Sequence, residues 1–515
     1  MANKNLFNSR ANTTASCNTI NNAGGKAYSL ASKAALAQYA MTGCFNNTFY
    51  VSDKNQLQNV LELCNKVDAE FIAKLAVYSR EQGLMKDMPA VLTAVLSKKD
   101  PVLFSKIFNK TINNPKILRT FVQVMRSGAI GRKSLGSKPK KLIQQYLESL
   151  TDEQLFKADI GNNPSLKDII KMVHPKPSSQ SRNALYSYLI NKNTDSNDLN
   201  TIIKVYENFK KNGSGHIPNV PFQMLTSLPL TKDHWKQIAS YATWNQVRMN
   251  LNTFARHSVF EDNQIVNKLA TKLADKSQVL NAKVFPFALY TAYKASHQNV
   301  PVEISNALQD AAEHALENIP TFNGKVYVMV DVSGSMQYPI TGFSTSSTTC
   351  VDVAAVFASA ILRKNPSAEV IPFDIDVHTN HSLNPRDSIM TNATKLATFG
   401  GGGTSCSKAL EYLNNNNSKG DLVIYISDNE SWMDSSAYSN STLTMLEWKK
   451  FKSRNPYAKL VNIDIQPNRS TQTPNQKDIL NIGGFSDNIF DVIEKFTKFG
   501  NNERLWVNLI ESVTL

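Results

Sequence analysis

One short run limits the possible folds of this chain more than any other feature. The sequence KVYVMVDVSGSM, residues 325–336, is an apolar stretch rich in β-formers that ends in a carboxylate and two hydroxyls, those of Asp331, Ser333 and Ser335. Such a run is typical of a strand covered on both faces of a parallel sheet. Ligands of open parallel sheets bind beyond the carboxyl ends of the strands. The run therefore predicts an α/β domain with oxygen donors at one edge of its sheet.

The sequence that follows supplies the rest of such a domain. Apolar runs such as AEVIPFD, DLVIYIS and AKLVNIDIQ alternate with helical segments such as VDVAAVFASAILRK and DNIFDVIEKFT. This alternation predicts a doubly wound α/β sheet over residues 321–498. Two further oxygen donors, Thr404 and Asp428, follow a glycine run and a strand. Hard oxygen ligands suit Mg2+ or Mn2+, so we expect one of these cations at the five side chains.

The residues before this domain have helical character. From 25 to 320, apolar residues recur at helical spacing, and N-cap residues such as Asp68, Asp100 and Asn114 precede the segments. Many short helices joined by short loops favour stacked hairpins of the HEAT or armadillo kind over a four-helix bundle. We therefore expect a multidomain chain. Its parts are a flexible segment 1–24, an α-helical solenoid 25–320, the α/β domain 321–498 and a tail 499–515.

Composition excludes several classes of protein. With 42% hydrophobic and 19% charged residues, the chain is not intrinsically disordered. Its five cysteines are scattered and form no C-x-x-C pair. The sequence contains neither an apolar leader nor a run of about 18 apolar residues. We expect a cytoplasmic protein with reduced thiols and no membrane segment.

Charge is divided unequally along the chain, whose net charge is +14. Residues 1–320 hold 39 Lys and Arg against 23 Asp and Glu, a net charge of +16, whereas residues 321–515 hold 17 against 19, a net charge of −2. Such an asymmetry indicates a polyanionic partner for the helical part, either nucleic acid or a membrane surface. Solubility alone also explains a moderate excess, but we favour nucleic acid.

The densest positive charge lies between Lys98 and Leu147, where twelve Lys and Arg residues face one acidic residue, Asp100. At its centre, RSGAIGRKSLGSKPKK alternates Gly and Ser with cations, so side chains and backbone N–H groups can both contact phosphates. A solvated lysine-rich face is the alternative, and it suffices for any of these lysines taken singly. For the cluster we expect RNA phosphate contacts. The candidate residues are Arg126, Arg132, Lys133, Lys138, Lys140 and Lys141.

A second candidate surface lies in SLKDIIKMVHPKPSSQSRN. Lys167, Lys171 and His174 are spaced i, i+4 and i+7, so they share one face of a helix. The alternative for His174 is a helix C-cap before Pro175.

The five metal-ligand candidates resemble the metal-ion-dependent adhesion site of von Willebrand factor A domains. That site uses D-x-S-x-S, a Thr and an Asp on three loops, and the matching residues here are Asp331, Ser333, Ser335, Thr404 and Asp428. The resemblance implies that the cation keeps an open coordination position, which an acidic residue of a partner completes. Such a site binds and does not catalyse. A vestigial site that only ties loops together is the alternative.

The order of the two regions resembles the Ro autoantigen family, which is named for its TROVE module. Runs in family order are GRKSLGSKPKK, LKDIIKMVHPKPSS, VFPFALYTAYK, GGGTSCSKAL, DNESW, AKLVNIDIQ and LNIGGFSDNIFDVIEKF. The resemblance covers about residues 25–498. It implies that HEAT-like helices close into a ring sealed by the A domain.

The same resemblance implies a function. The outer surface would bind small structured Y-like noncoding RNA, and the hole would take single-stranded 3′ ends of misfolded RNA. Lys167, Lys171 and His174 match the outer Y RNA region. One departure is NQVRMNLNTFARH, in which Met249 stands where arginine is expected and Arg248 precedes it, so Arg248 is the candidate RNA contact there. An exoribonuclease or another protein would offer an acidic residue to the metal, and the protein would be a monomer.

Three functions from different classes remain. The first is an RNA-binding scaffold for noncoding RNA, acting in RNA quality control or as a degradation adaptor. The second is a metal-dependent protein-adhesion module without RNA, against which the positive charge of the helical part argues. The third is an enzyme, because FDIDVH resembles the D-x-D of haloacid-dehalogenase phosphatases through Asp374 and Asp376. The residues after Asp376 depart from that motif and no Walker loop occurs, so we expect no enzyme.

Overall fold

The computed structural model describes most of the chain as two compact units. The described residues are 14–43, 45–192, 198–213, 215–284, 286–317, 319–340, 348–434, 440–484, 486, 488–499 and 502–515. The sheet unit comprises Met1–Lys66 and Leu316–Ile510. The helical unit comprises Val67–Ala315 and Glu511–Leu515.

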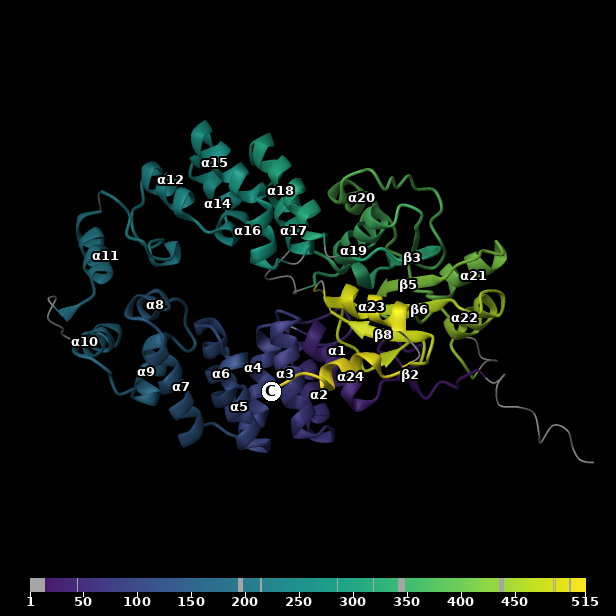
Figure 1. Cartoon of the computed structure of the whole chain (residues 1–515), viewed down its shortest axis with the longest axis horizontal. Helices are drawn as coiled ribbons and strands as arrows, with labels where there is room; N and C mark the ends of the chain where they lie inside the picture. Colours follow the sequence, from purple (N-terminus) through teal and green to yellow (C-terminus); the bar gives the residue numbers. More distant parts are fainter. Residues whose placement is uncertain are drawn as a thin grey trace, which may run out of the picture. The chain divides into compact units, whose positions relative to one another are not determined.

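A five-stranded parallel sheet forms the centre of the sheet unit (Figure 1). In spatial order its strands are β4 (Glu369–Phe373), β3 (Val326–Asp331), β5 (Leu422–Ser427), β6 (Lys459–Asp464) and β8 (Ile479–Gly483). Asp331 pairs with the last residue of β4, and Ser427 pairs with Asp464, so the carboxyl ends of the strands are level. This sheet confirms the predicted doubly wound α/β domain.

Helices cover both faces of the sheet. On one face, α21 (Ser407–Asn415) and α22 (Leu443–Arg454) bury Leu410, Trp448 and Phe451 in a core with sheet residues such as Met329 and Tyr425. Further helices of this domain are α19 (Cys350–Lys364), α20 (Ile389–Leu396) and α23 (Asn488–Phe499). Helices α19 and α23 meet through Phe357 and Phe490, whose ring centroids lie 5.3 Å apart. Apolar side chains on both faces explain why these strands read as continuous apolar runs.

Residues 14–66 also belong to the sheet unit, whereas the sequence pattern assigned 25–320 to the helical part and called 1–24 flexible. A small antiparallel sheet joins β1 (Thr19–Ile20) to β2 (Lys26–Ser29) and β2 to β7 (Ser470–Thr471). The Tyr28 hydroxyl lies 2.8 Å from that of Ser441. Strand pairing therefore holds Thr19 and Ile20 of the segment predicted to be flexible, and residues 1–13 of that segment lie outside the described residues.

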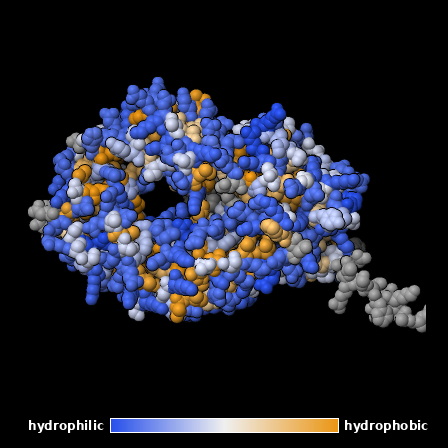
Figure 2. Space-filling view, in the orientation of Figure 1, coloured by the Kyte–Doolittle hydropathy of each residue, from blue (hydrophilic) through white to orange (hydrophobic). Residues whose placement is uncertain are grey.

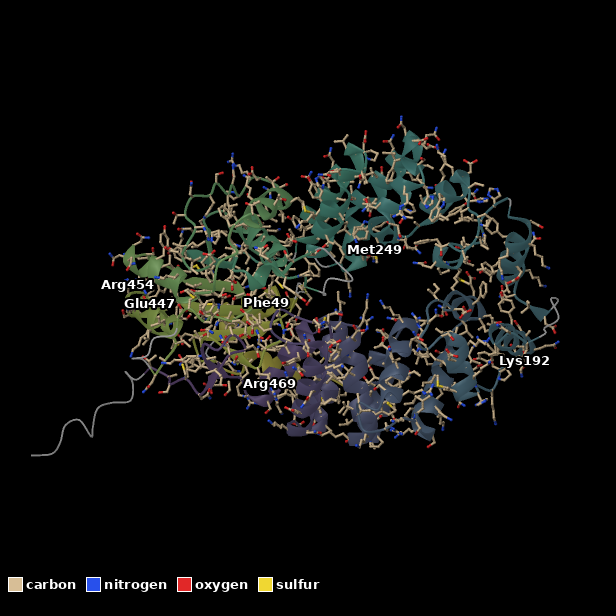
Figure 3. All side chains as sticks on the ribbon, turned by 180° about the vertical axis from the view of Figure 1, so that it is seen from behind. Phe49, Lys192, Met249, Glu447, Arg454 and Arg469 are labelled. Carbon is tan, nitrogen blue, oxygen red and sulfur yellow. The ribbon has the colours of Figure 1, made fainter. Side chains whose placement is uncertain are left out.

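Two helices follow in this N-terminal part. Helix α1 (Ser32–Thr42) packs against β8, and Gln38 donates a hydrogen bond of 2.9 Å to Asp464. Helix α2 (Asp53–Lys66) is held by Arg469, labelled in Figure 3, which donates to Asn59 at 3.0 Å and to Glu62 at 3.2 Å. These contacts span more than 400 residues of sequence. Both helices lie in the region 25–320 for which helical character was predicted, but only these contacts assign them to the sheet unit.

Short helices that pack on their sequence neighbours build the helical unit (Figure 1). They are α3 (Ala69–Glu81), α4 (Asp87–Lys99), α5 (Pro101–Thr111), α6 (Pro115–Ser127), α7 (Ser137–Ser149), α8 (Asp152–Lys157), α9 (Leu166–Val173), α10 (Gln180–Leu189), α11 (Thr201–Asn212), α12 (Lys232–Tyr241), α13 (Trp244–Met249), α14 (Leu251–Arg256), α15 (Asn263–Ala274), α16 (Lys276–Ala282), α17 (Pro286–Ser296) and α18 (Val302–Ala315). Asp68, Asp100 and Asn114 accept the predicted N-cap bonds, and Gly128 ends α6 with φ of 86°.

Some details of the helical unit differ from the predicted pattern. The sequence pattern of residues 243–256 predicts one helix, but the chain is broken at Asn250 into α13 and α14. Outside the helical unit, the predicted tail 499–515 contains a further helix, α24 (Leu505–Glu511), which belongs to the sheet unit as far as Ile510 and buries Trp506 and Ile510. Hydrophilic residues cover most of the face of the helical unit in Figure 2. Among the described residues, no helix is both long and apolar enough to cross a bilayer.

Candidate metal centre and basic surface

The five predicted metal ligands come together at the carboxyl edge of the sheet. Asp331 ends β3, and Ser333 and Ser335 follow on the next loop. Asp428 follows β5, and Thr404 lies on the loop before α21. All five side chains are at most 3% exposed. Three loops thus bring two carboxylates and three hydroxyls to one buried place.

Hydrogen bonds organise these ligands. One carboxylate oxygen of Asp331 accepts from the backbone N–H of Ser333 at 2.9 Å, and the other accepts from the Ser427 hydroxyl. The hydroxyls of Ser333 and Ser335 lie 3.3 Å apart. Oδ2 of Asp428 is buried without a hydrogen-bond partner within the described part of the chain. An unpaired buried carboxylate oxygen is costly, and a cation would satisfy it.

Electrostatics also favour a cation here. Burial raises the pKa of Asp331, and the charge of Asp428 raises it further. Burial likewise raises the pKa of Asp428, with Glu430 as the neighbouring charge. Glu430 is buried beside them, and burial raises its pKa to about 7. The residues present therefore fit Mg2+ or Mn2+, because a divalent cation would offset the repulsion among these carboxylates.

The glycine run before Thr404 lets two loops approach closely. Gly400 has φ of 87°, and a Cβ at this position would lie 1.9 Å from the backbone oxygen of Val332. The N–H of Gly401 donates to that oxygen at 2.8 Å, and the N–H of Gly334 donates to Gly402 at 2.8 Å. Glycine is required at Gly400 because any side chain would push the Thr404 loop away from the D-x-S-x-S loop.

A cavity of about 440 Å3 opens above the ligands. Ser335 and Thr404 line it together with the glycine run and Trp432. Phe49 and Tyr50, which lie in the N-terminal part of the chain, complete its wall. A hydrogen bond to Ser335 counters the rise that burial causes in the pKa of Tyr50. Sequence reasoning missed both aromatic residues because nothing in FNNTFYVSD indicates a contact with a loop almost 300 residues away.

Asp374 and Asp376, which carried the phosphatase alternative, have local structural roles. The Asp374 carboxylate accepts from the backbone N–H groups of Gly402 at 3.2 Å and of Asp376 at 3.3 Å. Asp376 accepts from the N–H of Val377 at 2.8 Å. Asp374 therefore helps to position the glycine run, and this arrangement favours a structural reading of the D-x-D pair.

Most of the predicted RNA contacts lie on the surface of the helical unit. Four residues from the loop after α6 and from the first turns of α7, Lys133, Lys138, Lys140 and Lys141, are exposed. Arg132 instead turns back on this loop, donating to the backbone oxygens of Ser134 and Leu135, each at 3.1 Å. Arg132 thus shapes the loop that presents the four lysines.

The structure joins the two predicted RNA regions into one. Arg126, at the end of α6, lies 3.2 Å from the sulfur of Met172 in α9. Gln144 of α7 donates to the carbonyls of Val173 at 2.6 Å and His174 at 3.2 Å. These contacts place the end of α9 beside α6 and α7. The residues Arg126, Lys133, Lys138, Lys140, Lys141, Lys171 and His174 form what we call the basic surface.

His174 and Lys167 show how the second region is built. His174 has φ of 51° and caps α9 through its N–H, 2.9 Å from the carbonyl of Ile170, while its side chain is exposed. The capping alternative therefore holds for the backbone of His174, whereas its imidazole ring is exposed. Lys167 lies at the other end of α9, where its charge lowers the pKa of Asp159, a carboxyl whose pKa is raised overall by burial.

Arg248 lies apart from the basic surface. Its guanidinium donates to the backbone oxygen of Ala288 at 2.9 Å, and burial lowers its pKa to about 10. This bond ties α13 to α17, so Arg248 has a structural role. The neighbouring Met249, labelled in Figure 3, is 71% exposed. The guanidinium of Arg248, a predicted RNA contact, is therefore directed toward α17, and the residue is only partly exposed.

Helical hairpins combined with a doubly wound sheet and an oxygen-lined strand edge define a protein of helices plus a von Willebrand factor A domain. Residues 325–497 match the family model described as the Ro60 vWA domain. The chain is 22% identical to the RNA-binding protein RO60 of Deinococcus radiodurans, over 93% of this chain and 95% of that protein. The predicted resemblance to the Ro family is thereby confirmed.

The fold is matched by a solved structure as well. The crystal structure of the Deinococcus radiodurans RO (RSR) protein superposes on this chain with a TM-score of 0.63 at 17% identity. The match covers 91% of this chain and 99% of the other. The predicted fold class is therefore confirmed for the helical region and the α/β domain.

Proposed function

We propose that this chain is an RNA-binding protein of the Ro type. The observation that carries the proposal is the basic surface, where four exposed lysines stand beside Arg126 and the ring of His174. The helical unit holds 33 Lys and Arg against 21 Asp and Glu, a net charge of +12. Clustered cations on one surface bind a phosphate backbone, and the similar Deinococcus protein is named for RNA binding.

The proposed RNA is a small structured noncoding RNA of the Y type, held on the basic surface. A folded RNA is recognised largely by its shape, through contacts to its phosphates. Several cations on adjacent helix ends suit such contacts. Single-stranded ends of misfolded RNA would bind elsewhere on the helical unit. Together these activities would serve RNA quality control or recruit an RNA-degrading enzyme. The basic surface supports the first of the two RNA classes directly.

A charge-matched pair of variants tests this proposal. Changing Lys133, Lys138, Lys140 and Lys141 to alanine should reduce the slope of log affinity against log salt by about 3, because each phosphate that is no longer neutralised removes about 0.7–0.9. The control variant removes the same charge from exposed lysines of the sheet unit, which are Lys54, Lys66, Lys419 and Lys477. Filter binding of a structured RNA between about 50 and 200 mM salt measures both slopes. Equal slopes in the two variants would contradict the proposal.

A second candidate function belongs to the metal centre. We propose that Asp331, Ser333, Ser335, Thr404 and Asp428 hold Mg2+ or Mn2+ and that the cation takes a carboxylate from a partner protein. The unpaired Oδ2 of Asp428 supports this function. The cavity above Ser335 and Thr404 leaves room for a ligand on the open side. Oxygen donors of this kind bind hard cations, which commonly keep open or water-filled positions.

Metal titration tests this second function. Excess Mg2+ at a hundredfold over its dissociation constant should stabilise the sheet unit by about 2.7 kcal/mol. Asp428→Ala should abolish the heat of binding in isothermal titration, whereas Asp376→Ala, an exposed carboxylate at the end of the neighbouring strand, should preserve it. Absence of metal heat in the parent protein would show that the site is vestigial.

A further inference from the structure

The mouth of the metal centre is surrounded by exposed apolar side chains. Phe49, Ile375, Trp432 and Met433 are 52%, 49%, 43% and 50% exposed. Gly403 shows that three of them converge, because a Cβ there would lie 2.9 Å from Trp432, 3.1 Å from Met433 and 3.3 Å from Ile375. Phe49, labelled in Figure 3, lines the same cavity as Trp432. We call these four side chains the apolar rim.

This clustering is unusual within the sheet unit. Phe49 and Trp432 line the cavity, and Ile375 and Met433 lie against Gly403 in its wall. Among the described residues of the unit, the other large apolar side chains that are exposed are Ile20, Tyr457 and Phe499, and none of them lines the cavity or lies against Gly403. Single exposed apolar residues need no explanation, but a contiguous group around a polar site marks a binding surface. The apolar rim is thus the kind of surface that a ligand buries.

The chemistry below the rim selects the ligand. Ser335 and Thr404 lie in the cavity, and the metal they would hold attracts a carboxylate. The wall from Gly401 to Gly403 has no side chains, so a peptide backbone can approach it. A carboxylate on the metal thus places its neighbouring residues against the apolar rim.

We propose that this mouth recognises a protein segment in which a carboxylate side chain is flanked by bulky apolar side chains. The inference rests on the proposed metal-dependent function and names its partner class. The charge of the cation is complementary to the carboxylate, and the rim is complementary to the flanking residues. Burial of one such side chain contributes about 1.5–3 kcal/mol, which corresponds to tenfold or more in affinity.

The N-terminal part of the chain takes a direct role in this recognition. Ala23, Phe49 and Tyr50 line the cavity although they lie outside the segment 325–497 that matches the Ro60 vWA domain. Phe49 is fixed by ring contacts, with centroids 4.8 Å from Tyr50 and 6.1 Å from Tyr338. The A domain alone would thus present only part of the binding site. Specificity for the flanking residues depends on Phe49 as well as on Trp432.

Two peptides test the proposal on the full chain. Isothermal titration in saturating Mg2+ compares acetyl-Gly-Leu-Asp-Phe-Gly-amide with acetyl-Gly-Ser-Asp-Ser-Gly-amide. The apolar peptide should bind at least about tenfold more tightly. Phe49→Ala and Trp432→Ala should each remove most of this difference, whereas Tyr457→Ala, which changes a 90% exposed aromatic residue outside the rim, should preserve it. Thermal melting checks that each variant is folded. If one rim variant does not fold, the other still provides the comparison with the parent protein.

The outcomes separate this inference from the function on which it rests. Metal heat combined with equal affinities for the two peptides, or with no binding of either, would overturn the apolar-rim inference and leave the metal site intact. Absence of metal heat would overturn the metal site itself. Tight binding of the apolar peptide that survives EDTA would overturn the role of a carboxylate bound to the metal. A difference that is lost in both rim variants and kept in Tyr457→Ala would support the proposal.

Discussion

The two units differ in where their charged side chains lie. Within the described residues of the helical unit no carboxylate is buried. The unit holds 33 Lys and Arg residues against 21 Asp and Glu residues, and this excess of positive charge lies largely on the surface. The described part of the sheet unit buries seven carboxylates, those of Asp331, Asp352, Asp374, Asp428, Glu430, Asp434 and Asp464. The first arrangement suits a polyanion that comes from solution. The second suits a small cation, because burial of a charge is costly unless a counterion or hydrogen bonds compensate.

This difference predicts whether a mutation should change binding or stability. Exposed cations contribute little to stability because water and salt screen them, so their removal should change binding alone. Buried carboxylates hold loops together through hydrogen bonds, so their removal should change stability first. The following predictions test this contrast, beginning with the largest expected effect.

Asp434 provides the strongest test. Its carboxylate accepts hydrogen bonds from the hydroxyls of Ser405, Ser407 and Ser431 and from the N–H of Ser407. Because hydrogen bonds to a charged group contribute about 1.5–3 kcal/mol each, Asp434→Ala should lower the free energy of unfolding by at least about 3 kcal/mol. Lys141→Ala, on the basic surface, should change it by less than about 0.5 kcal/mol. Denaturant titration measures both, and similar losses would break the contrast.

Glu430 should make the stability of the sheet unit depend on pH. It accepts from Asn22 at 2.7 Å and from the N–H of Ala23 at 3.1 Å, and burial raises its pKa to about 7. Between pH about 4.3 and 7, the folded chain holds a proton that the unfolded chain has released. Stability in EDTA should therefore fall by up to about 4 kcal/mol as pH rises through this window. Glu430→Gln, which keeps an acceptor oxygen, should reduce this dependence, and the part that remains comes from carboxylates such as Asp331 and Asp428, whose pKa values burial also raises.

Melting of parent and variant at pH 5 and pH 8 checks this prediction. A parallel pH dependence in Glu430→Gln would assign the effect to other carboxylates. Added Mg2+ should reduce the parent's loss of stability at pH 8, because a cation nearby favours the ionised form.

The face of α9 should give the smallest effect and the most selective one. Replacing Lys167, Lys171 and His174 by alanine should weaken binding of a structured RNA and lower its salt slope by about 1 for each phosphate that the variant no longer engages. Binding of a single-stranded RNA should be largely preserved, and the melting temperature should not change. Parallel binding assays with both RNAs check the prediction. Equal weakening for the two RNAs in a folded variant would show that both RNAs use these residues, which would contradict the prediction.

Local signals in the sequence determined much of the architecture. The run ending in Asp331 predicted the strand and its ligand loop, and Asp100 and Asn114 predicted where helices begin. These signals act over a few residues, since a cap bonds within one turn and a strand shows its burial in its own apolar residues. Strand ends of a parallel sheet meet at one edge, so the sequence order of the motifs sufficed to bring together all five candidate ligands.

Other features were decided only by the tertiary structure. Arg248 looked like an RNA contact, but it is turned to the carbonyl of Ala288. Phe49 and Tyr50 line the cavity above the candidate metal ligands, and Arg126 of α6 contacts Met172 of α9. No local pattern encodes such contacts, because they depend on which faces of distant elements pack together. The sequence by itself thus determined the elements and the set of candidate metal ligands, while packing decided which side chains surround these candidates and which Lys and Arg side chains remain exposed.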